Sequence, residues 1–170
     1  MKRALIIICI PLMGLACYYF FPEKKLPAGV TIDKIVVFKS HHLMDVWSNG
    51  KLLKTYSISI GKNATGAKQL QGDNRTPEGS YFINDKNPNS TCYKNLGISY
   101  PDIKHAEAAK QLGKSAGGDI KIHGLLNGCG FIGKFHRWRD WTNGCIAVTD
   151  AEMDELYYHL AIGTAIDIYP

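Results

Sequence analysis

The arrangement of apolar and polar positions predicts a protein built mainly from β-strands. Short runs that are rich in β-branched residues, and that alternate in part with polar ones, are typical of half-buried strands. Such runs occupy residues 30–38, 44–48, 51–60, 79–83, 96–100, 119–124 and 164–169. Between the second and third runs lies Asn49-Gly50, which supplies the two positive φ angles of a type I′ turn, so we expect a hairpin there.

Capping residues predict two helices within this framework. The first, over residues 102–112, has an aspartate at its N-cap and Gly113 just past its end. The second, over residues 149–160, begins with a threonine and Glu152 in a capping-box pattern, and Gly163 is expected to end it.

The remaining segments read as loops. Residues 61–73 are polar and rich in glycine, and residues 85–95 contain too many Asn, Pro, Ser and Lys for a regular element. A long loop over residues 125–143 carries an aromatic and basic cluster and is expected to cross the mouth of a site. The fold class is therefore mainly β with two helices, in a single domain over residues 30–170 that is long enough for one hydrophobic core.

Residues 1–22 differ from the rest of the chain. A charged start followed by an apolar run from Ala4 to Phe21 predicts an export signal peptide or an anchor in the inner membrane. A buried core helix is the alternative, and Cys17 offers a further option as a lipidated residue. Residues 23–29 are expected to be a linker to an exported domain in the cell envelope, on the periplasmic face.

The charge pattern narrows the range of partners. The formal net charge of +5 comes from scattered lysines and arginines with no basic run, so we expect no nucleic-acid partner. A modest basic excess would also suit an anionic polymer such as a bacterial cell wall. The sequence contains no nucleotide, flavin or haem motif, so no cofactor is predicted.

The chemistry of the chain centres on a histidine and a cysteine. His123 closes one apolar strand, and Cys145 follows a turn and precedes another apolar run, so the two can supply a thiol nucleophile and its base. Asn143-Gly144 lets the backbone turn, so that the N–H groups of Gly144 and Cys145 converge on a tetrahedral oxyanion. One alternative is a buried structural cysteine and histidine. The other is a zinc site, for which the possible ligands are His123, Cys129, His136 and Cys145.

The other cysteines raise the question of a disulfide. Three cysteines lie in the domain, and an odd number in an exported protein suggests one pair and one free thiol. If Cys145 is the reactive thiol, Cys92 and Cys129 become the candidate disulfide.

Two motifs resemble a known family. His123-Gly124, followed after a loop by Thr142-Asn143-Gly144-Cys145-Ile146, is similar to the motif of the L,D-transpeptidase catalytic domain (YkuD) family. The resemblance extends to residues 72–81, to residues 98–101 and to the final strand. It implies a β-sandwich-like domain that transfers an acyl group from a peptidoglycan stem peptide, with Cys145 as nucleophile, His123 as general base and Gly144 in the oxyanion turn.

Two positions depart from the commoner family pattern. Asn143 stands where most members have a second histidine, and Ala147 stands where many have an arginine. Residues 140–148 instead resemble a branch that includes a peptidoglycan amidase, which releases attached lipoprotein. An L,D-transpeptidase in cell-wall biogenesis or remodelling is therefore the main hypothesis. A hydrolase on the same fold, cleaving lipoprotein-linked or stem-peptide bonds, is the first alternative, and a non-catalytic wall-binding domain is the second.

Further residues are candidates for binding the substrate. Arg137 and Arg139 offer planar donor forks to a stem-peptide carboxylate, although a solvated loop face would look the same. The other candidates are positions inside or next to the motifs, namely Arg75, Tyr100, Gly124, Trp141 and Thr142.

Overall fold

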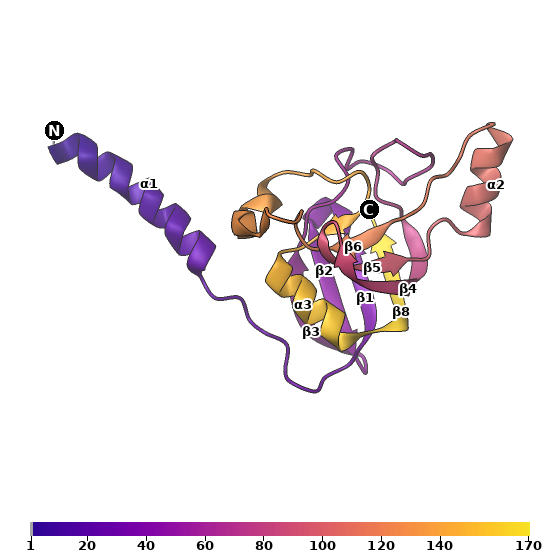
Figure 1. The fold of residues 1–170 in the computed structure, drawn as a ribbon, viewed down its shortest axis with the longest axis horizontal. Coiled ribbons are helices and arrows are strands. Elements are labelled where there is room, and N and C mark those ends of the chain that lie inside the picture. The colour runs from indigo at the N-terminus through magenta and orange to yellow at the C-terminus, as the bar shows by residue number, and fades with distance from the viewer. Residues whose placement is uncertain (1) are drawn as a thin grey trace.

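The computed structural model describes residues 2–170, with side chains from Ile10 onward. It contains one eight-stranded sheet in the order β3-β2-β1-β8-β4-β5-β6-β7 (Figure 1). The strands are β1 (Ile32–Phe38), β2 (Leu43–Ser48), β3 (Lys51–Ser57), β4 (Gly79–Ser90), β5 (Tyr93–Ile98), β6 (Lys121–His123), β7 (Ile146–Ala147) and β8 (Leu160–Tyr169). The helices are α1 (Lys2–Phe20), α2 (Ile103–Gln111) and α3 (Asp150–His159), with 3₁₀ segments η1 (Lys39–His41) and η2 (Gly130–Trp138).

The long strand β4 joins the two halves of the sheet. Its first residues, Gly79 to Phe82, pair with β8, and from Ile83 onward it pairs with β5. The register shifts between Ile83 and Asp85. Irregularities of this kind bend a strand and let it pass from one layer to another, as in orthogonally packed sandwiches. The structure confirms the expected mainly β, sandwich-like domain.

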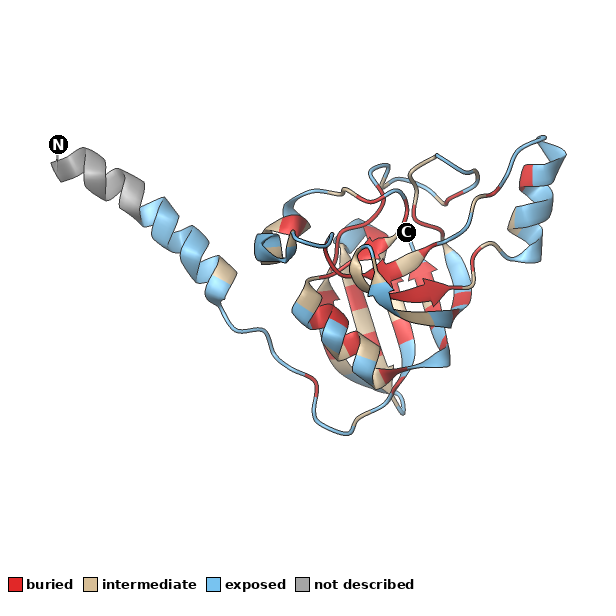
Figure 2. Cartoon of the chain, in the orientation of Figure 1, coloured by how far each residue is buried: buried red, intermediate tan, exposed pale blue. Residues whose placement is uncertain are grey.

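Both halves contribute to one core (Figure 2). Alternate residues of β1, β2 and β8 are buried, and α3 packs against β5 and β6. The core side chains include Ile35, Val46, Tyr56, Ile83, Leu96, Ile122, Ile146, Met153, Leu156 and Ile166. The site described below therefore rests on strands whose opposite face is fully packed.

Local sequence signals place several elements as predicted. Asn49 and Gly50 adopt φ angles of 49° and 74°, which closes the β2–β3 hairpin. Asp102 caps α2 by accepting from the backbone of His105, and Gly113 follows with a φ of 66°. The capping box predicted at the start of α3 is also present.

Two predicted boundaries were wrong. Residues 85–95 do not form a loop, because β4 continues to Ser90 and pairs with β5 across two register shifts. Gly163 does not end α3, which stops at His159 and passes directly into β8. Gly163 instead lies in an irregularity of β8, where its φ is 92° and the register against β1 shifts between Ile32 and Lys34.

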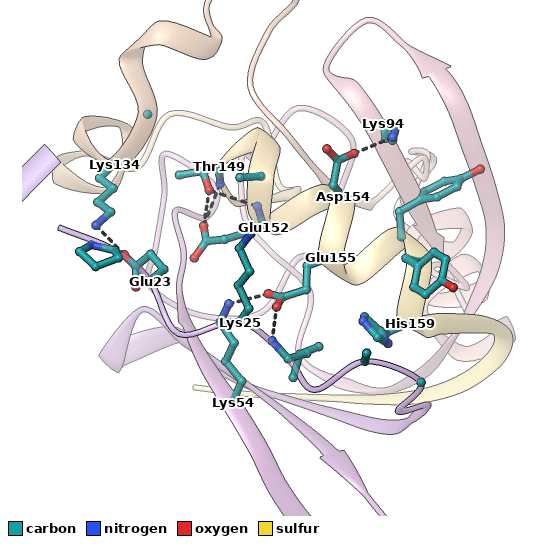
Figure 3. Close-up of a pocket in the computed structure, with 18 of the residues that line it drawn as sticks. Glu23, Lys25, Lys54, Lys94, Lys134, Thr149, Glu152, Asp154, Glu155 and His159 are labelled. Carbon is teal, nitrogen blue, oxygen red and sulfur yellow. Dashed lines mark hydrogen bonds and ion pairs between the residues drawn. The ribbon is translucent and has the colours of Figure 1, made fainter. Parts of the chain in front are cut away.

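The segment before β1 is in contact with the domain. Leu26, in the predicted linker, is buried in the core. A hollow of about 1050 Å³ lies between this segment and α3, and its walls are joined by ion pairs such as Lys54–Glu155 and Lys134–Glu23 (Figure 3). Among the described residues, no helix combines the length and the apolar character needed to cross a bilayer. The export or anchoring role of residues 1–22 stays a prediction.

The predicted disulfide is absent. Cys92 and Cys129 are both free thiols. Cys92 lies at the β4–β5 turn, where its amide bonds to the Ser90 hydroxyl, whereas Cys129 lines a hollow formed by the loop after β6. The two segments are joined by Asn127, which bonds to Ser90, Thr91 and Tyr93, yet the two thiols are not paired. Cys17 is also free, and exposed.

Candidate functional site

His123 and Cys145 are brought together by a parallel pair of short strands. β6 pairs with β7 so that Ile122 lies opposite Ile146 and His123 opposite Ala147. Side chains alternate between the faces of a strand, so His123 and Ala147 share the face that lies opposite the buried Ile122 and Ile146. Cys145 immediately precedes Ile146 and therefore continues that same face. The histidine and the cysteine are thus about two residues apart along adjacent chains.

The tautomer of His123 is fixed by its own turn. Its Nδ1 lies 2.6 Å from the carbonyl oxygen of Gly124, which can only accept, so Nδ1 carries the hydrogen and Nε2 keeps a free lone pair. Burial lowers the pKa of His123, and this outweighs the hydrogen bond to Gly124. The imidazole is accordingly neutral near pH 7. The Trp141 ring packs edge-on against it, with centroids 5.6 Å apart.

Asp150 holds the turn that carries His123, a role that sequence reasoning missed. Its Oδ1 accepts a hydrogen bond from the Leu125 amide at 2.8 Å. The same oxygen lies 2.7 Å from where a Cβ on Gly124 would be, so a larger residue does not fit. The amide of Val148, the residue after β7, donates to the carbonyl of His123. The only local signal was that Asp150 is the first residue of a capped helix.

Cys145 is held as a thiol. Its Sγ lies 3.6 Å from the carbonyl oxygen of Asp119, a residue with a left-handed φ of 60°. Burial raises the pKa of Cys145, although hydrogen bonding to the Lys121 backbone lowers it in part. The thiol is therefore protonated and the His123 imidazole neutral, which is the resting state expected where a histidine removes the thiol proton during the reaction.

The turn before Cys145 is built around Thr142. The Thr142 hydroxyl accepts from the amide of Gly144 at 3.1 Å and donates to the carbonyl of Cys145 at 2.7 Å. The Gly144 amide, predicted to serve an oxyanion hole, is therefore engaged with Thr142 in this state. Asn143 is exposed and accepts from the Lys62 ammonium at 3.1 Å.

Arg75 lies against the same turn. A Cβ on Gly144 would lie 2.6 Å from the carbonyl oxygen of Arg75, and Gly144 has a φ of 131°. The backbone of Arg75 thus lies next to Gly144, the residue before Cys145. The Nε atom of Arg75 is buried and has no partner among the described residues.

Tyr100 and Arg137 are engaged elsewhere in the protein. Tyr100 is buried, and its ring packs against those of Tyr81 and His105. The Arg137 guanidinium pairs with Glu23 at 3.0 Å and with Glu152 at 2.7 Å. A substrate-binding role for Arg137 would require these pairs to break.

The loop after β6 places His136 beside the site. The Ser59 hydroxyl gives its one hydrogen to the His136 carbonyl at 2.9 Å, so it accepts from the His136 Nδ1–H at 3.2 Å. Burial lowers the pKa of His136 to about 4, and its Nε2 has no partner among the described residues. Ser59 and His136 carried no recognisable signal in the sequence as a pair. The described residues contain no cluster of three or more His, Cys, Asp or Glu side chains arranged to hold a metal ion.

The fold is a β-sandwich-like domain in which a cysteine and a histidine lie on the same face of two paired strands. Residues 32–168 match the model of the L,D-transpeptidase catalytic domain (YkuD) family, and the chain belongs to that family. This assigns it to a family associated with peptidoglycan.

Particular relatives support the assignment. YafK of Escherichia coli (strain K12), described as a candidate L,D-transpeptidase, is 30% identical over 132 residues, covering 72% of this chain and 45% of YafK. The chain thus spans less than half the length of the curated relatives that it matches.

Solved structures show the same fold. The helical cell shape determining protein Pgp2 from Campylobacter jejuni superposes with a TM-score of 0.61 at 23% identity, over 82% of this chain and 48% of that one. An L,D-transpeptidase from Xylanimonas cellulosilytica gives 0.55 at 15% identity, over 86% and 65% of the two chains.

Proposed function

We propose that this chain is a cysteine acyltransferase that acts on peptidoglycan stem peptides in cell-wall biogenesis or remodelling. The observation that carries the proposal is the pairing of β6 with β7. This pairing sets Cys145 and His123 on one face, with the Nδ1–H of His123 bonded to Gly124 and Nε2 left as a base. Family membership makes the stem peptide the expected donor. We further propose that the domain works on the periplasmic face of the cell envelope, exported through residues 1–22.

The chemistry would proceed in two steps. His123 Nε2 takes the thiol proton as Cys145 Sγ attacks the amide carbonyl, and the tetrahedral oxyanion forms near the turn amides. The carbon–nitrogen bond then breaks, and the protonated His123 gives its proton to the leaving amine. An acceptor amine then attacks the resulting thioester and gives up a proton to His123. The carbon–sulfur bond breaks, and the protonated His123 returns the proton to Cys145 Sγ, which restores the free thiol.

The second step decides between transferase and hydrolase. Water can replace the amine in the same geometry, with His123 again as the base. Ala147 lies opposite His123, is fully buried and offers no charge to the acyl site, and Asn143 turns toward Lys62. The departures from the family pattern therefore leave few polar groups to select the acceptor, and hydrolysis of stem-peptide or lipoprotein-linked bonds is the alternative outcome.

The test uses the full chain and two variants, Cys145→Ala and Cys92→Ala. Each is incubated with disaccharide-tetrapeptide and with lipoprotein-linked muropeptide, and both the products and the intact protein mass are read by mass spectrometry. Cys92 is the matched control because it is also a free thiol.

Three outcomes separate the readings. Cross-linked dimers, made by the wild type and by Cys92→Ala alone, together with a thioester adduct on Cys145, establish the transferase. Release of free peptide with the same dependence on Cys145 establishes the hydrolase. Identical behaviour of all three proteins, with no adduct, would replace both by a wall-binding domain.

A further inference from the structure

A second cavity lies close to His123, to which it is linked by the ring of Trp141. It has a volume of about 200 Å³ and is formed by the loop that follows β6. One wall is Leu125, two residues after His123, and another is Trp141, whose ring packs against the imidazole. Cys145 Sγ, in contrast, contacts Asp119, which precedes β6, whereas His123 ends that strand. Along the chain, His123 therefore lies between Asp119, which contacts the thiol, and Leu125, which begins the wall of the cavity.

The walls of the cavity combine an apolar lining with a few polar groups. The lining residues are Leu125, Leu126, Cys129, Ile132, Phe135, His136, Arg139 and Trp141. Two of them, His136 and Trp141, each have a buried ring nitrogen without a partner among the described residues. Buried polar groups are normally paired, and an unpartnered one marks a place where a ligand or water belongs.

The two ring nitrogens offer opposite hydrogen-bonding roles. The Trp141 Nε1–H can only donate. Because the Nδ1–H of His136 is given to Ser59, its Nε2 is an acceptor in the neutral ring. A hydrocarbon alone would pair with neither ring nitrogen. An amino acid can pair with both, because its N–H groups donate to His136 Nε2 and its carbonyl or carboxylate oxygens accept from the Trp141 Nε1–H.

Arg139 adds a positive charge at the cavity. It is exposed, and within the described part of the chain it forms no ion pair, unlike its neighbour Arg137. An unpaired guanidinium next to an apolar hollow fits a carboxylate attached to an apolar body.

We infer that this cavity binds the amine half of the substrate, and that it selects an amino acid with an apolar side chain larger than a methyl group. The inference rests on the proposed acyl transfer. His123 must give its proton to the leaving nitrogen and later take one from the entering nitrogen. Each of these nitrogens in turn therefore lies at the Nε2 atom of His123. The groups that such a nitrogen carries then extend past the imidazole toward Leu125 and Trp141, and a carboxylate reaches Arg139.

The first test measures which amines the full-length enzyme accepts from a tetrapeptide donor. The series is glycine, alanine, leucine and phenylalanine, in both enantiomers where they exist, and isopentylamine, which is leucine without its carboxylate. We expect leucine to react at least about tenfold more efficiently than glycine, since a few methylenes in an apolar pocket give this degree of selection. Equal use of glycine and leucine would overturn the inference.

Variants assign the selection to the cavity. Cys129→Phe fills the hollow and should lower the use of leucine about tenfold more than the use of glycine. Arg139→Gln should raise the KM for leucine and not that for isopentylamine. Lys110→Gln, on the distant helix α2, is the matched charge control. If Arg139→Gln raised the KM for leucine and for isopentylamine equally, the result would contradict a contact between Arg139 and the carboxylate.

A binding readout keeps this inference distinct from the proposed function. In Cys145→Ala the remaining thiols are alkylated with iodoacetamide, and the rate at Cys129 is compared with the rate at Cys92 by peptide mass spectrometry. Leucine should slow the labelling of Cys129 selectively, and glycine should not. Protection without any acylation of wild-type Cys145 would keep the cavity and reject the transferase. Acylation without protection or selection would keep the transferase and reject the cavity.

Discussion

Gly144 is the residue whose replacement tests the turn before Cys145 most directly. Its φ of 131° is unfavourable for any other residue, and a Cβ there would lie 2.6 Å from the carbonyl oxygen of Arg75. We expect Gly144→Ala to lower the free energy of unfolding by about 2 kcal/mol or more, and to reduce acylation of Cys145 about a hundredfold because the thiol is displaced. Urea denaturation and intact-protein mass spectrometry measure the two effects.

Gly128 provides the control for this change. It also has a positive φ, of 83°, but a Cβ there would meet no atom within 4 Å. Gly128→Ala should therefore cost stability through backbone strain while sparing the acylation rate. If both variants acylated equally well, close packing at Gly144 would not matter to the site.

His136 makes the fold sensitive to acid. Its pKa is lowered by burial from 6.5 to about 4, so the unfolded chain binds a proton on His136 at a higher pH than the folded protein does. Stability is therefore fully present above pH 6.5 and is lost as the pH falls toward 4. At about 1.4 kcal/mol per pH unit, the shift corresponds to a loss of about 3–4 kcal/mol.

The corresponding measurement is the free energy of unfolding at pH 7 and at pH 4.5. His136→Asn keeps a donor toward Ser59 and should be less stable than the wild type at pH 7, yet lose clearly less stability on acidification. His41→Asn, at an exposed position, is the control. If His136→Asn were as sensitive to acid as the wild type, the loss of stability would come from other groups. His123 is one such group, because its pKa is also lowered by burial.

At the scale of elements, local signals were sufficient where the structure depends on neighbours in sequence. The start of α2, the start of α3 and the β2–β3 turn could be predicted because a cap or a tight turn is set by three or four adjacent residues. The second half of β4 could not, because its polar composition is unfavourable for a strand and pairing with β5 overrides it. The direct passage from α3 into β8 likewise depends on pairing with β1.

The same distinction applies to the site. Cys145, His123 and the Gly144 turn carry recognisable local chemistry. The strand of His123 was expected, whereas the short strand β7 after Cys145 was not. Asp150 and the Ser59–His136 pair were not predictable, because each acts across a contact between segments that are distant in sequence. Arg137 looked available for substrate because its partners, Glu23 and Glu152, come from two other segments.

The first residue of α3 should matter more for His123 than for the helix itself. Asp150→Ala removes the acceptor of the Leu125 amide, so the turn after His123 loosens. We expect acylation of Cys145 to fall about tenfold and stability to fall by about 1–2 kcal/mol, the cost of an unsatisfied buried donor. Asp150→Asn, which keeps an oxygen in place, should restore most of both.

Thr149, the N-cap residue before Asp150, provides the control for this change. Thr149→Ala breaks the capping box and should cost about 1 kcal/mol of stability, measured by urea denaturation. Its acylation rate should stay near that of the wild type, since Thr149 makes no bond to the His123 turn. A rate loss equal to that of Asp150→Ala would mean that α3 acts on the site only through its overall stability.

At the scale of the whole molecule, the end of α1 is connected to the loop that borders the site. The Tyr19 hydroxyl donates to the carbonyl of Phe131 at 2.7 Å, and its ring packs 5.4 Å from that of Phe135. Glu23 adds ion pairs to Lys134 and Arg137. These contacts hold η2, which also contributes His136 to the cavity beside His123. Although α1 itself projects from the domain (Figure 1), its last turn therefore contributes to the order of the site.

Tyr19→Ala tests this connection. The change removes the hydrogen bond to η2 and the ring contact with Phe135, so residues 130–138 should open more often and their amides should exchange with deuterium faster. Phe21→Ala is the matched control, because its side chain is exposed and its backbone contact with Lys134 is kept. Amides of α2 should be unaffected in both variants, which excludes global destabilisation. If η2 exchanged alike in the wild type and Tyr19→Ala, the loop would be ordered by the domain alone. Faster exchange together with weaker selection between leucine and glycine would show that the N-terminal segment helps to shape the binding cavity.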